Sequence, residues 1–240
     1  DVTDPDSVGR GVAEVAQRLG PPSIVVNNSG VTATRSALDL DAGEWDKIMD
    51  TNLRGAWLVA RASAKLLIEA KLAGSIINIA SILGFRVAGH VAPYAASKAG
   101  LVQLTQALAL EWARYRIRVN AIAPGYIETD LNRDFFASDL GKALVARIPQ
   151  RRLGQIGDLD GALLLLASDA SAYMTGSSIV VDVQIVDRDG GGTLPLYPSR
   201  GKSYVAGIPG HRYSVRLVNR TGARKSAAGA LRRTALDDQP

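Results

Sequence analysis

Residues 23–28 read Ser-Ile-Val-Val-Asn-Asn, an apolar run that ends in two asparagines. The run is short and continuously apolar, which is typical of a strand buried on both faces of a parallel sheet. The segment before it has the pattern of an amphipathic helix that starts at Asp4-Pro5, because Asp caps helices well and Pro is favoured at their first position. Gly20-Pro21-Pro22 ends that helix. This end of the chain therefore predicts a helix followed by a buried strand.

Similar strand patterns recur along the chain, separated by helical patterns. Apolar runs suited to strands lie at residues 75–80, 117–123 and 177–183. Helical patterns lie at about 44–72, 94–113 and 158–167. Strands that alternate with helices of roughly ten or more residues indicate right-handed βαβ crossovers. We therefore predict an α/β fold with a parallel sheet over residues 1–183.

The composition excludes several classes of function. A chain of 240 residues of which 47% are apolar can bury a full core. It has no cysteine, and His90 and His211 are too far apart in the sequence to suggest a zinc site, so we expect no bound metal. Neither a run of about 18 apolar residues nor a signal-peptide pattern is present, so we expect no membrane partner and a cytoplasmic location.

The net charge of +5 belongs to the C-terminal part of the chain. Residues 1–183 carry 18 Lys and Arg against 19 Asp and Glu, a net of −1, whereas residues 184–240 carry 10 against 4, a net of +6. We therefore expect no nucleic-acid partner for the main body. Residues 184–222 alternate apolar and polar positions and predict a β-rich appendage. Residues 223–240 lack aromatic side chains, and we expect them to be disordered.

Tyr94 and Lys98 lie four residues apart in Tyr-Ala-Ala-Ser-Lys and share one face of a predicted helix. A nearby ammonium favours the phenolate, so we expect it to lower the tyrosine pKa from about 10 toward neutrality. Ser81 ends a predicted strand, and open α/β sheets bind ligands at the carboxyl ends of their strands. Asn52 lies inside an otherwise apolar helix, where asparagine is a mediocre choice. Taken singly, the Tyr-Lys pair also suits one exposed helical turn, and Ser81 also suits a cap.

Taken together, these residues resemble the short-chain dehydrogenases/reductases, from Asp1 to about Asp182. The resemblance implies a Rossmann-like, doubly wound parallel sheet. The matching positions are Asn-Asn-Ser-Gly at 27–30, Asn52, Ser81, Tyr94, Lys98, Pro-Gly-Tyr-Ile-Glu-Thr at 124–129 and Tyr-Met-Thr-Gly-Ser-Ser-Ile-Val-Val-Asp at 173–182.

The resemblance implies an oxidoreductase that transfers a hydride between NAD or NADP and a secondary alcohol or ketone. Tyr94 would be the general acid/base, and Lys98 would lower its pKa and hydrogen-bond the nicotinamide ribose. Ser81 would polarise the carbonyl, and Asn52 would hold a water for proton relay. The implied cofactor-binding residues are Asp1, Val2, Asn28, Gly30, Tyr94, Lys98, Ile127 and Thr129. A 3-oxoacyl thioester or a sugar-like polyol is the expected substrate, chosen by a loop at about 130–151.

The same resemblance implies a homo-oligomer, a tetramer or a dimer, because the helices at about 53–72 and 94–113 pair between subunits in the family. The sequence departs from the family twice. The family's first strand and glycine-rich turn are absent, which predicts an N-terminally truncated, partial NAD(P)-binding domain over residues 1–183. Beyond it, residues 184–222 faintly resemble a small bacterial β-rich family of unknown function. The alternative function is therefore an inactive partial or chimeric product whose tail is a binding module.

Overall fold

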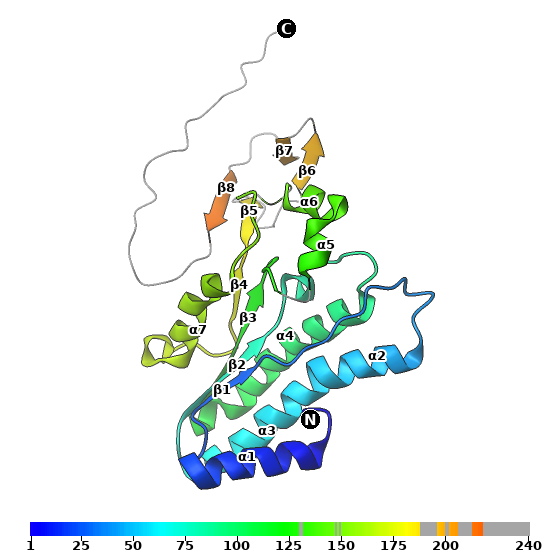
Figure 1. The fold of residues 1–240 in the computed structure, drawn as a ribbon. Coiled ribbons are helices and arrows are strands. Elements are labelled where there is room, and N and C mark those ends of the chain that lie inside the picture. Colours follow the sequence, from blue (N-terminus) through cyan, green and yellow to red (C-terminus); the bar gives the residue numbers. More distant parts are fainter. Residues whose placement is uncertain are drawn as a thin grey trace.

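A parallel sheet with helices on both faces forms the centre of the computed structural model (Figure 1). The structure describes residues 1–129, 132–146, 148 and 150–182, and the backbone of 183–187, 196–199, 202–205 and 213–217. The sheet order follows the chain: β1 (Ile24–Asn27), β2 (Gly74–Ile79), β3 (Ile117–Pro124) and β4 (Ser178–Val181). Every neighbouring pair is parallel, so the predicted Rossmann-like α/β fold is confirmed.

The bounds of the helices are α1 (Pro5–Leu19), α2 (Ala42–Met49), α3 (Gly55–Glu69), α4 (Ala92–Trp112), α5 (Arg133–Ala137), α6 (Asp139–Val145) and α7 (Asp160–Ala167). Helices α1, α3, α4 and α7 lie close to the predicted positions, whereas α5 and α6 lie in the segment at about 130–151 that the sequence predicts to be a loop. As predicted, Asp4 caps α1 by accepting a hydrogen bond from the Asp6 amide, and Gly20 ends the helix with a φ of 88°. The predicted helix at 44–72 is interrupted, because a π-helical turn, Asp50–Arg54, joins α2 to α3.

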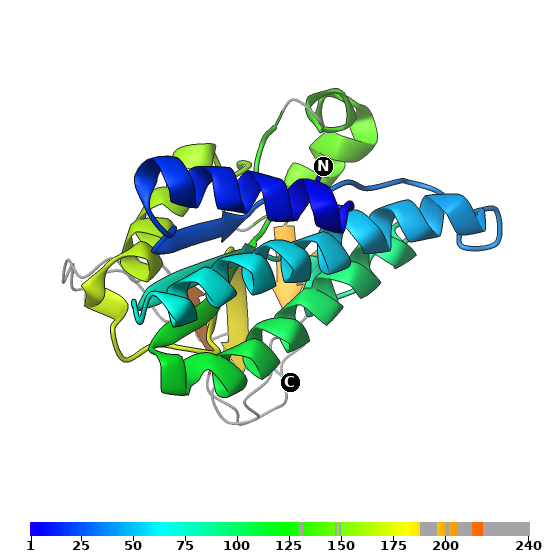
Figure 2. The same ribbon diagram turned by 90° about the horizontal axis from the view of Figure 1, so that it is seen from below.

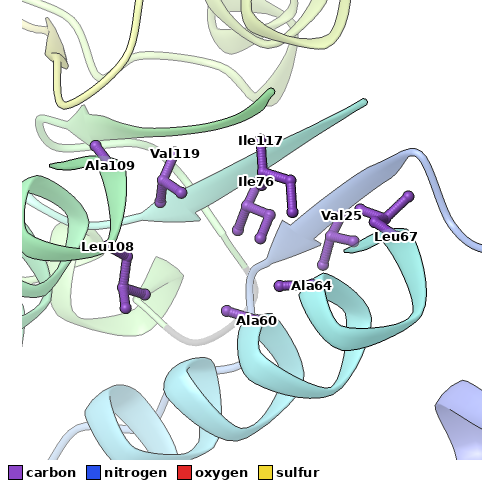
Figure 3. Packing of buried hydrophobic residues seen from close by; sticks show 9 residues of the cluster. All are labelled: Val25, Ala60, Ala64, Leu67, Ile76, Leu108, Ala109, Ile117 and Val119. Carbon is purple, nitrogen blue, oxygen red and sulfur yellow. The ribbon is translucent and has the colours of Figure 1, made fainter. Parts of the chain in front are cut away.

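Two helical layers enclose the sheet. Helices α3 and α4 pack on one face and α7 packs on the other, while α1 lies outside against α3 (Figure 2). Successive side chains of β2 point to opposite faces of the sheet: Ile76 packs against α3 and α4, and Ile77 packs against α7. The larger core cluster, shown in Figure 3, consists of Val25, Ala60, Ala64, Leu67, Ile76, Leu108, Ala109, Ile117 and Val119.

Strand β1 is half-buried, and the prediction that it is buried on both faces is wrong. Val25 packs against α3, whereas Ile24 and Val26 are 49% and 42% exposed. The reason is that α7 packs mainly against β2 and β3. Within the residues that the structure describes, β1 also pairs with a strand on one side only.

Beyond β4, the described backbone forms antiparallel pairs. Strand β5 (Val183–Asp187) pairs with β8 (Tyr213–Leu217), and β6 (Leu196–Ser199) pairs with β7 (Lys202–Val205). The proposed division at residues 183 and 222 stays a prediction, and residues 223–240 lie outside the described part. No helix in the described part is long and apolar enough to cross a membrane.

Buried side-chain amides tie the sheet to helix α4. Asn27 and Asn78 are register partners in β1 and β2, and the Asn27 amide donates to Asn78 Oδ1 over 2.8 Å. Asn78 in turn donates to Thr105 Oγ1 over 2.9 Å, and Thr105 donates to the main-chain oxygen of Leu101 over 2.7 Å. Thr105 and Asn78 are almost completely buried, so each of these bonds replaces water that the groups have lost.

We expect Thr105→Val to lower the free energy of unfolding by about 1–3 kcal/mol, because the valine matches threonine in shape but leaves a buried Asn78 donor unpaired. Urea denaturation measures the change. Thr34→Val, the same substitution at an exposed threonine, should change stability by less than about 0.5 kcal/mol. Equal stability of Thr105→Val and the wild type would refute the role of the amide chain.

Candidate active site

The predicted catalytic side chains gather at the carboxyl ends of the strands. Ser81 follows β2 by two residues, and Tyr94 and Lys98 occupy the first turns of α4. The turn Ile82–Gly84, which starts directly after Ser81, packs against α4. A strand end and a helix start are thereby held together at the edge where open α/β sheets bind ligands.

Lys98 is the most deeply buried charged group of this cluster. Its side chain is 4% exposed, and its Nζ donates to the main-chain oxygen of Ile79 over 2.7 Å. The same Nζ lies 5.7 Å from the centroid of the Tyr94 ring. Burial disfavours the ammonium and lowers the pKa of Lys98 from 10.5 to about 8. The lysine is therefore charged at neutral pH but releases its proton more easily than an exposed lysine.

Tyr94 does not have the lowered pKa that the sequence predicts. Burial raises the pKa of its phenol above 10.0, and the nearby Ser81 hydroxyl opposes this rise through a hydrogen bond. Lys98 contributes no resolved shift to the phenol. The expectation failed because residue spacing reveals the neighbouring ammonium but not the loss of water around the tyrosine. Ser81 also caps the turn after it by accepting a hydrogen bond from the Leu83 amide over 3.1 Å. Its roles as a cap and as a candidate site residue are therefore compatible.

Asn52 holds together segments that are far apart in the sequence. Its side chain pairs with both main-chain groups of Val31, accepting from N over 2.8 Å and donating to O over 2.9 Å. It also donates to Ser97 Oγ over 3.0 Å, and Ser97 donates to the main-chain oxygen of Tyr94 over 2.8 Å. The π-helical turn that contains Asn52 is a feature often found at functional sites.

Ser97 is a site residue that the sequence reasoning missed. It is completely buried and connects Asn52 to the helical turn that carries Tyr94. Its position three residues after Tyr94, on the same helical face, was the available signal.

The predicted cofactor-binding residues fall into separate groups. Asn28 and Gly30 follow β1, and Gly30 lies beside Asn52 and Lys98. Asp1 and Val2 line a groove of about 420 Å³ between α1 and β1. Ile127 and Thr129 follow β3, where Asn132 fixes both: it donates to the oxygen of Ile127 over 2.8 Å and accepts from the amide of Thr129 over 2.9 Å.

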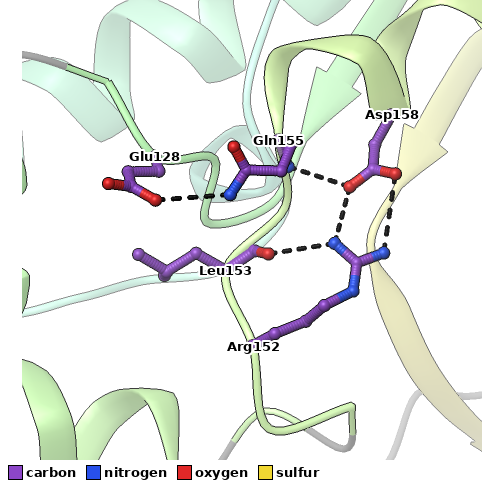
Figure 4. Close-up of polar contacts among 5 residues, drawn as sticks. All are labelled: Glu128, Arg152, Leu153, Gln155 and Asp158. Atoms are coloured by element: carbon purple, nitrogen blue, oxygen red, sulfur yellow. Dashed lines mark hydrogen bonds and ion pairs between the residues drawn. The ribbon is translucent and has the colours of Figure 1, made fainter.

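A polar clamp closes the base of the segment that contains α5 and α6. Ile127 bridges to Gly154, so the chain entering this segment pairs with the chain leaving it. Figure 4 shows the clamp: Arg152 contacts both carboxylate oxygens of Asp158, at 2.7 and 3.5 Å, and Gln155 reaches Glu128 over 3.3 Å. The Arg152 guanidinium holds the pKa of the Asp158 carboxyl below its usual range.

The described residues contain no group of three or more His, Cys, Asp and Glu side chains that could hold a metal ion. Tyr94, Ser81 and Lys98 can supply proton transfer and hydrogen bonding at this site.

Comparison with known proteins gives consistent matches over this part of the chain. Residues 1–183 match the family model described as Enoyl-(Acyl carrier protein) reductase. A 2-dehydro-3-deoxy-D-gluconate 5-dehydrogenase of Escherichia coli (strain K12) is 40% identical over 179 residues, 74% of this chain and 69% of that protein. A 3-oxoacyl-(acyl-carrier-protein) reductase of Pseudomonas aeruginosa is 38% identical over 182 residues, 76% of this chain and 73% of that protein.

Solved structures agree. A gluconate 5-dehydrogenase from Burkholderia cenocepacia J2315, in complex with NADP and tartrate, superposes with a TM-score of 0.73 at 36% identity, covering 76% of this chain and 71% of that one. A 4-hydroxyisoleucine dehydrogenase complexed with NADH has a TM-score of 0.72 at 30% identity, covering 76% and 75%. The chain belongs to the NAD(P)-dependent short-chain dehydrogenase/reductase family of oxidoreductases.

The lowered pKa of Lys98 predicts a pH-dependent stability. Below about pH 8 the lysine is charged in the native and unfolded states, and the native state carries the full cost of burying the ammonium. Between about pH 8 and 10.5 the native state loses this proton while the unfolded state keeps it, so the contribution of Lys98 to the free energy of unfolding rises, by about 1–3 kcal/mol.

Urea denaturation of the wild type and of Lys98→Met across that pH range isolates the effect. The wild type should gain stability relative to the variant as the pH rises. Lys65→Met, which removes an exposed lysine from α3, is the matched control and should show no such trend. A pH-independent difference between the wild type and Lys98→Met would contradict the prediction.

Proposed function

We propose that this oxidoreductase transfers a hydride between NAD or NADP and a secondary alcohol or ketone, with Tyr94 as the general acid/base. The observation that carries the proposal is the meeting of Tyr94, Ser81 and Lys98 at the carboxyl edge of the sheet. A positioned acid/base of this kind contributes roughly 10²–10⁴ to a rate. The resemblance of these positions to the family's catalytic residues supports the assignment.

The side of the site next to β1 fits a nicotinamide cofactor. A Cβ atom on Gly30 would lie 3.5 Å from Asn52 Oδ1 and 3.6 Å from Lys98 Nζ, so glycine keeps the approach to the ammonium clear. The ammonium donates one hydrogen bond to Ile79 and has further hydrogens for ribose hydroxyls. Asn28, Gly30, Ile127 and Thr129 would border the nicotinamide end, and Asp1 and Val2 the adenine end. When bound, the nicotinamide supplies or accepts the hydride.

The protein's own residues would transfer the proton and orient the substrate oxygen. Tyr94 would give a proton to the carbonyl oxygen during reduction and take one from the alcohol during oxidation. Ser81, close enough to hydrogen-bond the phenol, would hold the same oxygen in line. Asn52 would hold a relay water through its main chain or the remaining lone pair of Oδ1, because both amide hydrogens are engaged by Val31 and Ser97.

Two substrate classes remain, and the relatives represent both. The names of relatives include gluconate 5-dehydrogenase and 3-oxoacyl-(acyl-carrier-protein) reductase. We propose a sugar-like polyol or polyol acid, or else a 3-oxoacyl thioester, as the substrate. Solved relatives contain NADP in one case and NADH in another, so both cofactors belong in the assay.

Tyr94→Phe should lower turnover by roughly 10²–10⁴ while cofactor affinity stays within about two-fold, because the ring is kept and the transferable proton is lost. The assay is reduction of ketones from both substrate classes with NADH and NADPH, with calorimetry for cofactor binding. Tyr115→Phe, at the opposite end of β3, is the control and should keep full activity. Undiminished turnover in Tyr94→Phe would remove Tyr94 from its role.

We also propose that α3 and α4 form a subunit interface. Between them lies a groove of about 580 Å³ bordered by Leu53, Trp57 and Leu104, among others. Trp57 of α3 is 37% exposed and Leu110 of α4 is 84% exposed, so each helix presents a large apolar side chain to solvent. A twofold-related copy would cover the same patch on both subunits. A dimer or a tetramer built from such dimers is the assembly that we propose.

Light scattering at micromolar concentration tests the interface. The wild type should form a dimer or tetramer, and Ala107→Glu should weaken assembly at least ten-fold, because it places an unpaired carboxylate in the groove. Ala13→Glu, at an exposed alanine of α1, is the charge-matched control. A monomeric wild type would count against the proposed interface.

A further inference from the structure

One arginine connects the turn after Ser81 with the end of β4. Arg86 lies five residues after Ser81, and its backbone amide still bonds the turn that Ser81 begins, donating to the oxygen of Ile82 over 3.0 Å. Its Nη1 lies 3.4 Å from Oδ2 of Asp182, the residue that follows β4. The side chain therefore starts beyond the end of β2 and ends beside the end of β4.

To make this connection, Arg86 has to pass the end of β3. Strand β3 lies between β2 and β4, and the register places Gly125, the first residue after β3, beside Asp182. The carboxylate of Asp182 rests directly on Gly125, where a Cβ atom would come within 2.5 Å of Oδ1. Tyr126 follows, and burial and the Asp182 charge raise the pKa of its phenol while the Arg86 charge lowers it. Arg86, Tyr126 and Asp182 thus lie together beyond the carboxyl ends of β3 and β4, at the sheet edge that also carries Ser81.

The ion pair between Arg86 and Asp182 contributes too little to the stability of the fold to explain the position of Arg86. The Arg86 side chain is 38% exposed, and it has one contact, at 3.4 Å, with Asp182. Arg152, by comparison, contacts both oxygens of Asp158 and also donates to the oxygen of Leu153. An exposed pair of the Arg86 kind contributes little to stability. Among the described residues, the other N–H donors of the Arg86 guanidinium have no partner.

We propose that Arg86 binds a carboxylate of the substrate, so that the enzyme acts on keto acids and hydroxy acids in preference to neutral polyols and thioesters. The inference rests on the proposed function, since it assumes that Ser81 and Tyr94 hold the reacting oxygen. Strands β2 and β4 are two strand spacings apart, about 10 Å. A chain of roughly four to six carbons, with hydrogen bonds of about 2.8 Å at both ends, spans that distance.

Asp182 has a defined part in this arrangement. Its side chain is 12% exposed and contacts Nη1 of the guanidinium, which leaves the other nitrogens of the planar fork available for a second carboxylate. Arginine suits this task because its fork matches the geometry of a carboxylate and stays charged at every physiological pH.

The test is calorimetric titration of the protein with tartrate and with threitol, the neutral alcohol of the same carbon skeleton, with and without NADP. Tartrate should bind the wild type at least ten-fold more tightly than threitol. Arg86→Gln should weaken tartrate binding roughly ten- to hundred-fold, the loss expected for hydrogen bonds to a charged group, and leave threitol binding unchanged. Arg86→Lys should fall between the two, because it keeps the charge without the fork.

Arg116→Gln is the matched control, because it removes an exposed arginine at the opposite end of β3 whose side chain also makes one contact with a distant segment, to the oxygen of Lys71 over 2.7 Å. Its tartrate preference should equal that of the wild type. A wild type without preference for tartrate, a tartrate preference that persists in Arg86→Gln, or tighter binding of inorganic phosphate than of tartrate would each overturn the proposal. If Arg86→Gln does not fold, the proposal is tested by the tartrate affinity of Arg86→Lys, which should be intermediate, and by the salt dependence of tartrate binding to the wild type.

The outcomes also separate this inference from the proposed function. A protein that binds tartrate through Arg86 but reduces no ketone would refute the proposed hydride transfer and leave the carboxylate site in place. A protein that reduces neutral ketones as efficiently as keto acids would refute the carboxylate site and leave the hydride transfer in place.

Discussion

The hydrogen bond from the Lys98 ammonium to the main-chain oxygen of Ile79 determines how helix α4 meets the sheet. Burial of a charge is costly, so a sequence tolerates it only where the geometry returns a compensating interaction. Here the accepting carbonyl is the last of β2, two residues before Ser81, and the donor is one turn after Tyr94. This bond, together with the packing of the Ile82–Gly84 turn against α4, fixes the distance between the strand end and the helix start. Everything that the site does with a substrate oxygen depends on that distance.

The parts that the sequence predicted are those encoded by local patterns. The apolar runs, the Asp4-Pro5 start and the Tyr94–Lys98 spacing each follow from a few neighbouring residues, and each appears where expected. Asn52 was singled out as an unusual helix residue, but its partners Val31 and Ser97 come from segments 21 and 45 residues away. The periodicity of apolar residues does not reveal contacts between segments so far apart in the sequence. The raised pKa of Tyr94 escaped prediction for a related reason, because burial is a property of the assembled fold.

The asparagines of the strands also show that a hydrophobicity pattern does not reveal which side chains are buried. Asn27, Asn78 and Asn120 interrupt apolar runs, and a pattern of hydrophobicity treats them as imperfections. In the fold each is buried and bonded: Asn27 to Asn78, Asn78 to Thr105, and Asn120 to the main chain at Met174 and Ser177. Conversely, Ile24 and Val26 look like core residues in the sequence but are exposed, because which helix covers which strand is decided by the topology.

The π-helical turn at Asp50–Arg54 constrains the number of residues in the helical segment that it joins. A π-turn accommodates one residue more than the α-helix around it would. In an α-helix each residue advances the side-chain direction by about 100°, so deleting one residue here would rotate either the face that carries Asn52 or the face that carries Ala60 and Ala64. A deletion or insertion here is therefore expected to be costly, because Asn52 and the core contacts of α3 need different rotations about the same helix axis.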